Sequence, residues 1–106
     1  MDKALSLLGL ARRAGKLSLG HDATLASVKA KRAALVILSA DASERHIRSL
    51  RGAGYAGPLA SLPQSADELS AAVGKNCCIL ALEDAGFGAA LMKTIREEDI
   101  RYVYED

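Results

Sequence analysis

Near its start the chain reads Ser6-Leu-Leu-Gly-Leu-Ala-Arg-Arg-Ala-Gly15, then Lys16-Leu-Ser-Leu-Gly20, and then His21-Asp22, which opens a helical stretch that ends in Lys29-Ala-Lys31-Arg32. A turn that ends in glycine places the start of a helix at the surface, where backbone N–H groups and the positive end of the helix dipole can meet a phosphate group. The neighbouring lysines and arginines strengthen this positive field. The stretch therefore predicts a surface that binds an anion, and nothing in it suggests a catalyst.

Helical and strand patterns alternate along the rest of the chain. The spacing of Leu5, Leu8 and Ala11 is typical of a helix that stops at Gly15. Asp22 and Ser43 are expected helix N-caps, and Ser65 with Glu68 has the spacing of a capping box. We expect helices at about 3–14, 22–31, 43–52, 65–74 and 86–96, and strands at 16–19, 33–39, 58–62 and 77–82.

Two of these strands, Ala33–Ser39 and Cys77–Leu82, are almost entirely apolar instead of alternating. A strand without alternation is buried on both faces, so both should be central in the sheet. Strands that alternate with helices indicate a sheet covered on both sides. The sequence therefore predicts an α/β fold, a three-layer α/β/α sandwich around a four-stranded mixed sheet, in a single domain over residues 1–106 without a linker or an internal repeat.

The C-terminal extension, residues 99–106, contains Ile100-Arg-Tyr-Val-Tyr104, whose alternation is typical of a short strand. An isolated strand needs a sheet edge to pair with. We expect it to pair with the edge of its own sheet or with that of a neighbouring molecule, which would give a homodimer. The alternative is a frayed, solvated end, because charged residues flank the segment on both sides.

The composition limits the functional classes. Half of the 106 residues are hydrophobic, but the chain has one Phe and no Trp, which argues against a domain that stacks many bases on aromatic rings. No run of 18 apolar residues and no basic leader followed by an apolar segment occurs in the sequence. We therefore expect no membrane association and a cytoplasmic protein.

The charges are unevenly distributed. Residues 1–51 hold ten Lys/Arg and four Asp/Glu, a net charge of +6, whereas residues 52–106 hold four and nine, a net charge of −5. One interpretation is that solvated helix faces happen to differ in sign. The other is that one side of the molecule attracts a polyanion and the acidic side orients it.

Two glycine patterns resemble nucleotide-binding motifs. Gly52-Ala-Gly54-Tyr-Ala-Gly57 matches G-x-G-x-x-G, but that motif needs a strand before it and a helix after it, whereas here a helix precedes it and Pro58 follows. Gly86-Phe-Gly88 leaves a strand, yet Leu91 occupies the third glycine position. We interpret both as structural turns, and we expect no cofactor.

Residues for catalysis or metal binding are sparse. Cys77 and Cys78 are adjacent in an apolar strand and are expected to be buried thiols on opposite faces. His21 and His46 have no Cys or His neighbour in the sequence that would form a ligand pair, and His46 is expected at the surface. We predict neither a metal site nor an enzyme.

The order of these elements and the residues in them resemble the kink-turn RNA-binding ribosomal-protein family of ribosomal proteins L7Ae and L30e, and in particular its short bacterial members. The resemblance covers residues 4–96. It rests on Leu7-Leu-Gly-Leu-Ala-Arg-Arg-Ala-Gly15-Lys16, Gly20, Ala33-Ala-Leu-Val-Ile-Leu-Ser-Ala-Asp41-Ala-Ser43, Glu68-Leu, Val73-Gly74-Lys75 and Ile79-Leu-Ala-Leu-Glu-Asp84-Ala-Gly86-Phe87-Gly88. It implies the α/β/α sandwich and non-catalytic binding of structured RNA.

The resemblance also implies which residues read the RNA. Family members that bind a kink-turn carry a Gly, with Asn and Glu two and three positions after it and Lys six positions after it. Here Gly20 matches, but the other three positions hold Asp22, Ala23 and Ala26. Lys29 lies within about 60° of Ala26 around the helix and can reach back towards phosphate; the alternative is that it is simply solvated. The expected RNA-binding residues are Lys16, Gly20, His21, Asp22, Lys29, Gly74, Lys75 and Asn76.

Two functional classes follow. The first is an RNA-binding protein, associated with the ribosome or with translation, that recognises kink-turn-like RNA with a degenerate readout motif, largely through backbone and shape. The second is a protein-interaction module that keeps the fold but has lost specific RNA binding. Binding to a kink-turn RNA with a steep salt dependence would favour the first class.

Overall fold

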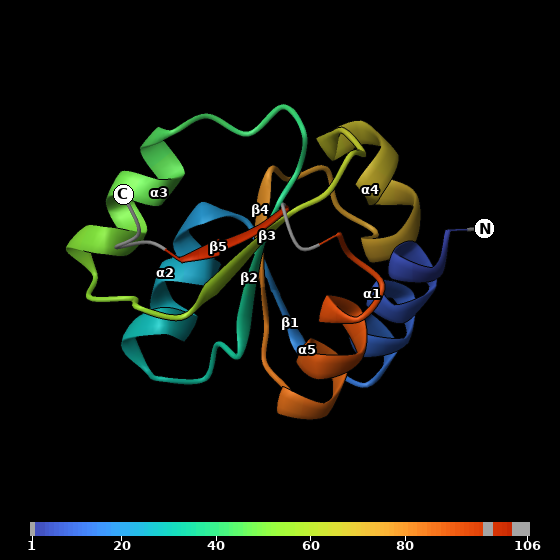
Figure 1. Ribbon diagram of the computed structural model, residues 1–106, viewed down its shortest axis with the longest axis horizontal. Coiled ribbons are helices and arrows are strands. Elements are labelled where there is room, and N and C mark those ends of the chain that lie inside the picture. The colour runs from blue at the N-terminus through green and yellow to red at the C-terminus, as the bar shows by residue number, and fades with distance from the viewer. Residues whose placement is uncertain (1, 97–98, 103–106) are drawn as a thin grey trace.

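The computed structural model describes residues 2–96 and 99–102, and it forms one α/β unit in this part of the chain (Figure 1). Helices and strands alternate from α1 to β4, as the sequence predicts. The helices are α1 (Lys3–Arg13), α2 (His21–Lys29), α3 (Arg45–Gly52), α4 (Ala66–Val73) and α5 (Ala85–Met92). The strands are β1 (Leu17–Leu19), β2 (Leu35–Leu38), β3 (Pro58–Ser61), β4 (Ile79–Leu82) and β5 (Ile100–Tyr102).

The sheet has the order β1-β4-β2-β3-β5. The first four positions hold the four predicted strands, and the fifth holds the strand from the C-terminal extension. β2 pairs in parallel with β3, whereas β4 is antiparallel to both β1 and β2, so the sheet is mixed, as predicted. All residues of β2 and β4 are buried, which confirms that the two apolar segments form central strands.

Helices cover both faces of the sheet, with α1, α4 and α5 on one side and α2 and α3 on the other (Figure 1). The two faces carry separate clusters of buried side chains. The first cluster includes Leu8, Leu69 and Leu80 and lies under α1, α4 and α5. The second includes Val28, Ile47 and Ile79 and lies under α2 and α3. This is the predicted three-layer sandwich. Within the described residues, none of the helices is both long and apolar enough to cross a membrane.

Some helix ends lie where the sequence predicts them and others do not. The capping box of Ser65 and Glu68 is present, and Gly74 closes α4 in the left-handed conformation, at φ 79°. The expected N-caps Asp22 and Ser43 are wrong. α2 begins one residue earlier because Gly20, at φ 97°, turns the chain and acts as the N-cap. α3 begins later because the first turn after Ser43 bonds residues three apart, with His46 N donating to Ser43 O.

The glycine-rich segment 52–57 is a turn, as interpreted from the sequence. It joins α3 to β3, and its shape is fixed by Tyr55, whose hydroxyl donates a hydrogen bond of 2.8 Å to Pro58 O. A Cβ on Gly57 would lie 2.7 Å from that hydroxyl oxygen, so only glycine fits under the tyrosine ring. The segment therefore has a packing function and is not the start of a nucleotide-binding helix.

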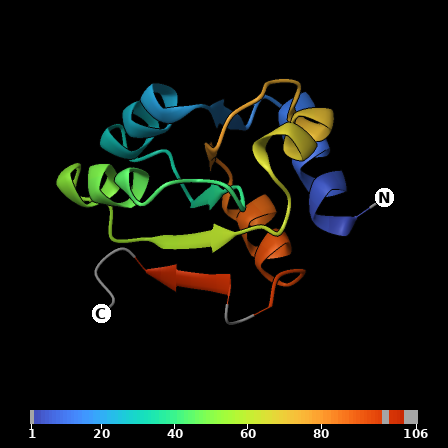
Figure 2. The same cartoon turned by 90° about the horizontal axis from the view of Figure 1, so that it is seen from above.

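The C-terminal extension pairs with its own sheet. β5 lies antiparallel to β3 at the edge of the sheet, with Ile100 opposite Ala60 and Tyr102 opposite Pro58 (Figure 2). This is one of the two pairings that the sequence predicts, and Val103 and Tyr104 lie outside the described residues. β5 is now the outer strand, so a homodimer through this extension stays a prediction that would use its outer edge.

We expect deletion of residues 99–106 to lower the melting temperature by roughly 4–8 °C, because the lost pairing with β3 should contribute about 1 kcal/mol to a domain of this size. Thermal unfolding measured by circular dichroism tests this expectation. Light scattering of the same sample shows whether the extension also joins two chains. If it does, the full-length protein has the mass of a dimer and the truncated protein has the mass of a monomer. An unchanged melting temperature would contradict the pairing of β5 with β3.

Candidate nucleic-acid interface

The start of α2 lacks the side-chain cap that α1, α4 and α5 have. Asp2, Ser65 and Asp84 each accept a backbone hydrogen bond at the start of α1, α4 and α5, whereas Gly20 offers no side chain to α2. Gly20 N donates to Ile79 O at 2.9 Å, which ties the helix start to β4. The first-turn N–H groups of α2 and the positive dipole end are therefore available to an anion.

The loop after α4 forms the second wall of this site. A Cβ on Gly20 would lie 3.6 Å from Lys75 Nζ, so the lysine ammonium reaches over the start of α2. Gly74 gives the loop its left-handed turn, and Asn76 Nδ2 donates to Asp67 Oδ1 at 3.3 Å. The structure thus brings Gly20 and the segment 74–76 together, at the place that the resemblance implies.

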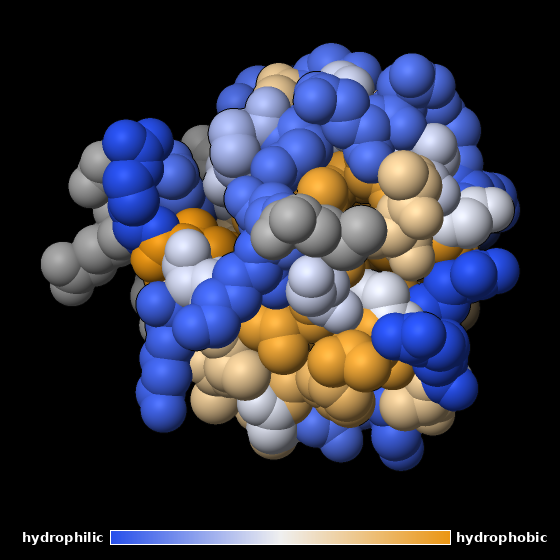
Figure 3. All heavy atoms as spheres, turned by 90° about the vertical axis from the view of Figure 1, so that its right-hand side faces the viewer, coloured by the Kyte–Doolittle hydropathy of each residue, from blue (hydrophilic) through white to orange (hydrophobic). Residues whose placement is uncertain are grey.

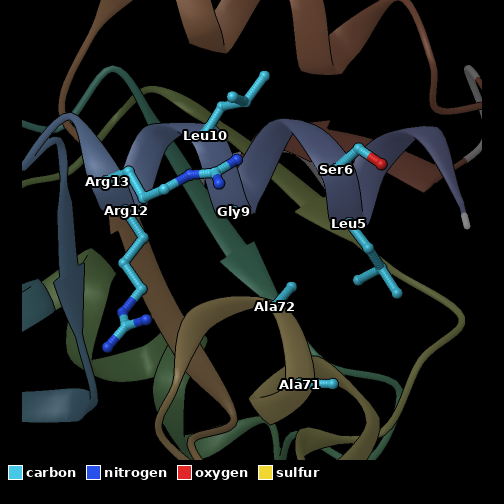
Figure 4. Close-up of a pocket in the computed structure, with 8 residues that line it drawn as sticks. All are labelled: Leu5, Ser6, Gly9, Leu10, Arg12, Arg13, Ala71 and Ala72. Carbon is cyan, nitrogen blue, oxygen red and sulfur yellow. The ribbon is translucent and has the colours of Figure 1, made fainter.

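Arg12 joins this site, although the sequence did not mark it as a binding residue. A Cβ on Gly74 would lie 2.5 Å from the guanidinium carbon of Arg12, so the arginine lies directly over the glycine. Figure 4 shows Arg12 leaving the last turn of α1, beside a groove of about 440 Å³ that α1 forms with α4. Arg12 and Gly74 are 62 positions apart in the sequence, so no local pattern relates them.

His21 and His46 are in contact, which corrects two expectations from the sequence. Their Nδ1 atoms are 2.9 Å apart, and His46 is buried, with 5% of its surface exposed. Burial lowers the pKa of His46, and the charges of Arg45 and His21 lower it further. The contact between the two Nδ1 atoms joins the start of α2 to the start of α3.

Lys16 and Lys29 lie away from this cluster. Lys16 precedes β1 and Gly20 follows it, so four extended residues separate them by about 13 Å. Lys29 is the last residue of α2, about 12 Å along the helix axis from His21. Lys29 instead lines a hollow of about 360 Å³ with Lys31 and the turn 53–57. Both separations exceed the length of an extended lysine side chain, so neither ammonium reaches the start of α2.

The positions that differ from the kink-turn motif are accessible. Asp22 and Ala26 are exposed and Ala23 is half-buried, so the helix has room there for longer side chains. In contrast, Thr24, Ser27 and Val28 face the sheet and are buried. The exposed face of α2 therefore consists mostly of small side chains. It offers an RNA the backbone and the shape of the helix, and few polar groups that could bond to base edges.

Cys77 directly follows the loop that forms the second wall of this site. Cys77 is buried, as expected, whereas Cys78 is only partly buried, because the strand β4 begins after both cysteines. Burial raises the pKa of the Cys77 thiol, so it is poorly suited to act as a nucleophile. Among the described residues, no group of three or more His, Cys, Asp or Glu side chains is placed to hold a metal ion. What the arrangement can do is hold an anion between a helix start, a lysine and an arginine.

Several known proteins resemble this chain in sequence and fold. A protein from Enterococcus faecium named RNA-binding protein YlxQ is 34% identical over 87 residues, which is 80% of this chain and 84% of that protein. A solved structure of a Bacillus halodurans protein of unknown function superposes with a TM-score of 0.76 at 30% identity, covering 89% of this chain and 97% of that one. The Giardia lamblia 15.5kD RNA binding protein shares the fold, with a TM-score of 0.65 at 18% identity over 85% of this chain and 79% of its own.

The family comparison covers most of the chain. The sequence profile of the ribosomal protein L7Ae/L30e/S12e/Gadd45 family matches residues 2–91, which include the helices α1 to α4, the strands β1 to β4 and all of α5 except its last residue, Met92. β5 lies beyond the matched range. The chain belongs to the ribosomal protein L7Ae/L30e/S12e/Gadd45 family.

Proposed function

We propose that this protein is a non-catalytic RNA-binding protein that holds a kink-turn-like RNA at the start of α2. The observation that carries the proposal is the approach of Lys75 to Gly20, with Arg12 over Gly74 beside it. Lys75 lies at the start of α2, which has no side-chain cap, and Arg12 lies over the neighbouring Gly74. Two cations near a helix start suit the phosphates at a sharp bend of an RNA backbone. The name of the Enterococcus faecium relative supports RNA as the partner.

The proposed mode of recognition relies on backbone and shape. Asp22 keeps a hydrogen-bond acceptor but brings a negative charge, and Ala23 and Ala26 offer no polar group to a base. Each good bidentate contact to a base edge contributes about 1–3 kcal/mol, so their absence should weaken binding relative to a protein with the complete motif. The family's ribosomal members support an RNA of the ribosome or of the translation machinery, in the cytoplasm, as the target.

We expect Lys75→Ala to weaken binding of a kink-turn RNA by roughly three- to tenfold and to reduce the slope of log K against log salt by about 1, because one phosphate contact is lost. Calorimetric titration at several salt concentrations measures both quantities. Lys93→Ala is the matched control, since Lys93 is exposed and follows α5 in the other helix layer. Equal affinities for Lys75→Ala and Lys93→Ala would mean that the RNA does not bind at the start of α2.

One observation favours the second function, a protein-interaction module. Leu10 is 47% exposed and lines the groove between α1 and α4 together with Leu5, Ala71 and Ala72. Figure 3 views this side of the molecule and shows apolar side chains gathered in its surface. If the wild-type protein binds no kink-turn RNA in the titration and forms a stable self-associated species, this second function replaces the first.

A further inference from the structure

The start of α3 lies directly beside the proposed RNA site. The contact between His21 Nδ1 and His46 Nδ1 joins the first residue of α2 to the second residue of α3. Arg45 therefore stands next to the site, close enough to lower the pKa of His46 through its charge, although burial lowers that pKa more. Arg48 follows one turn further along α3.

Arg45 and Arg48 form one basic pair on the exposed side of the helix. Residues three apart on a helix are neighbours, with Cβ atoms about 5–6 Å apart, and both side chains are exposed. The opposite side of α3 carries His46, Ile47 and Leu50, which are buried against the sheet. α3 thus presents two guanidinium groups to the solvent next to the start of α2.

The placement of Arg45 conflicts with the stability of its own helix. A cation at the first position of a helix meets the positive end of the dipole, which costs about 0.3–1 kcal/mol. The first turn of α3 contains no acidic residue, and Glu44 at the N-cap accepts no capping hydrogen bond from the helix. Arg51, by contrast, lies in the last turn, where a cation is favourable. A locally unfavourable residue beside a binding site points to a function for that residue.

Ion pairs within the fold do not account for the two arginines. In the described part of the chain, neither Arg45 nor Arg48 has a carboxylate within salt-bridge distance, whereas Arg32 pairs with Glu83 and Arg96 with Asp99. Arginine presents a planar fork of donors that matches phosphate oxygens. The pair is therefore available to an anion outside the chain.

The chemistry of α3 favours a nucleic acid over a protein as the partner. Protein interfaces have an apolar, mostly uncharged centre. The exposed residues of α3 are Arg45, Arg48, Arg51 and Gly52, so the helix offers no apolar side chain for such a centre. A row of cations without apolar neighbours fits a polyanion, whose backbone presents phosphates at short, regular intervals.

We propose that Arg45 and Arg48 bind the phosphate backbone of the RNA stem that continues from the bend held at the start of α2. This inference rests on the proposed function, because it needs the RNA to be placed at α2. It adds a second contact surface, on α3, that reads no base and sets the direction in which the stem leaves the protein. It also gives a role to two of the ten Lys/Arg residues of the positively charged segment 1–51.

The test compares two RNAs and two double variants. One kink-turn RNA carries a full-length stem on each side of the bend, and the other has both stems cut to the few base pairs needed to form the bend. The variant Arg45→Ala/Arg48→Ala removes the basic pair, and Lys3→Ala/Lys93→Ala is a control that removes the same charge from exposed positions in the other helix layer. Melting temperatures of both variants verify that they fold.

We expect Arg45→Ala/Arg48→Ala to bind the long-stem RNA about ten- to a hundredfold more weakly, to lose a salt-dependence slope of about 2, and to bind the short-stem RNA as the wild type does. The control should bind both RNAs as the wild type does. Equal losses for the two RNAs, or no loss, would overturn the role of α3 while Lys75→Ala still reports on the site at α2. Failure of the wild type to bind either RNA would overturn the proposed function itself, and this inference with it.

Discussion

Replacing Asp22 by Asn, Ala23 by Glu and Ala26 by Lys in one variant should tighten the binding of a kink-turn RNA by at least a hundredfold. Each restored side chain supplies a polar group to the RNA, and a good contact to a base edge contributes about 1–3 kcal/mol. Three contacts at the low end of that range give about 3 kcal/mol, which is more than two orders of magnitude in Kd. Calorimetric titration of the variant and the wild type measures the change.

The helix can accept these substitutions. Asp22 and Ala26 are exposed, and Ala23 is half-buried, whereas the buried residues of α2 are Thr24, Ser27 and Val28 and remain unchanged. A glutamate at position 23 lies in the first turn, where a negative charge stabilises the helix. Fold stability should therefore stay close to that of the wild type, and a change in affinity should not arise from a change in folding.

The triple variant also gains one positive charge, so a charge-matched control is needed. Ala89→Lys adds the same charge at an exposed position of α5, in the other helix layer. If this control gains as much affinity as the triple variant, the gain comes from charge and not from readout. If the triple variant binds no more tightly than the wild type, the start of α2 is not where kink-turn RNA binds.

Local patterns predict the scaffold of this protein well. The uninterrupted apolar runs predicted central strands because only strands covered on both faces tolerate them, and β2 and β4 are central. The spacing of Ser65 and Glu68 predicted a capping box because both bonds involve residues three apart, and the box is present. The apolar runs and the capping-box spacing each lie in, or within a few residues of, the strand or helix end that they predict.

The candidate site depends on contacts that no short pattern records. Lys75 reaches Gly20, and Arg12 lies over Gly74, only because packing brings α1 and the loop after α4 to the start of α2. His46, in the first turns of the expected helix 43–52, was expected at the surface, yet it is buried against His21. The amphipathic spacing of His46, Ile47 and Leu50 on α3 was the signal that could have placed it inside.

Glu83 also makes contacts that no short pattern in the sequence predicts. It follows β4, and its Oε2 atom accepts hydrogen bonds from Ser18 of β1 at 2.8 Å, from Ser27 of α2 at 2.5 Å and from Arg32 Nε at 3.3 Å. These partners precede it by 65, 56 and 51 positions. One carboxylate thus joins the edge strand, the helix that carries the proposed RNA site and the loop that enters β2.

We expect Glu83→Ala to lower the free energy of unfolding at neutral pH by about 2–4 kcal/mol. A hydrogen bond to a charged group contributes about 1.5–3 kcal/mol, and the variant would leave the buried Ser27 hydroxyl without its acceptor. Arg32→Ala should lower it by less than about 1 kcal/mol, since the arginine side chain is 55% exposed and its ion pair is solvated. Urea denaturation of both variants measures the difference, and equal losses would show that the serine contacts contribute nothing.

The effect of Glu83 should depend on pH in a defined direction. Burial raises the pKa of this carboxyl, but the hydrogen bonds from Ser27, Ser18 and Arg32 together hold it below its ordinary value of 4.5. A carboxyl whose pKa is lower in the folded state stabilises the fold above its unfolded pKa, and it loses this contribution as the pH falls through its folded pKa. The stability gap between the wild type and Glu83→Gln, which keeps the side-chain shape without the charge, should therefore be constant from pH 5 to 7 and should narrow below about pH 4.5. A gap that widens on acidification would mean that the charged form of Glu83 is not the form that the fold stabilises.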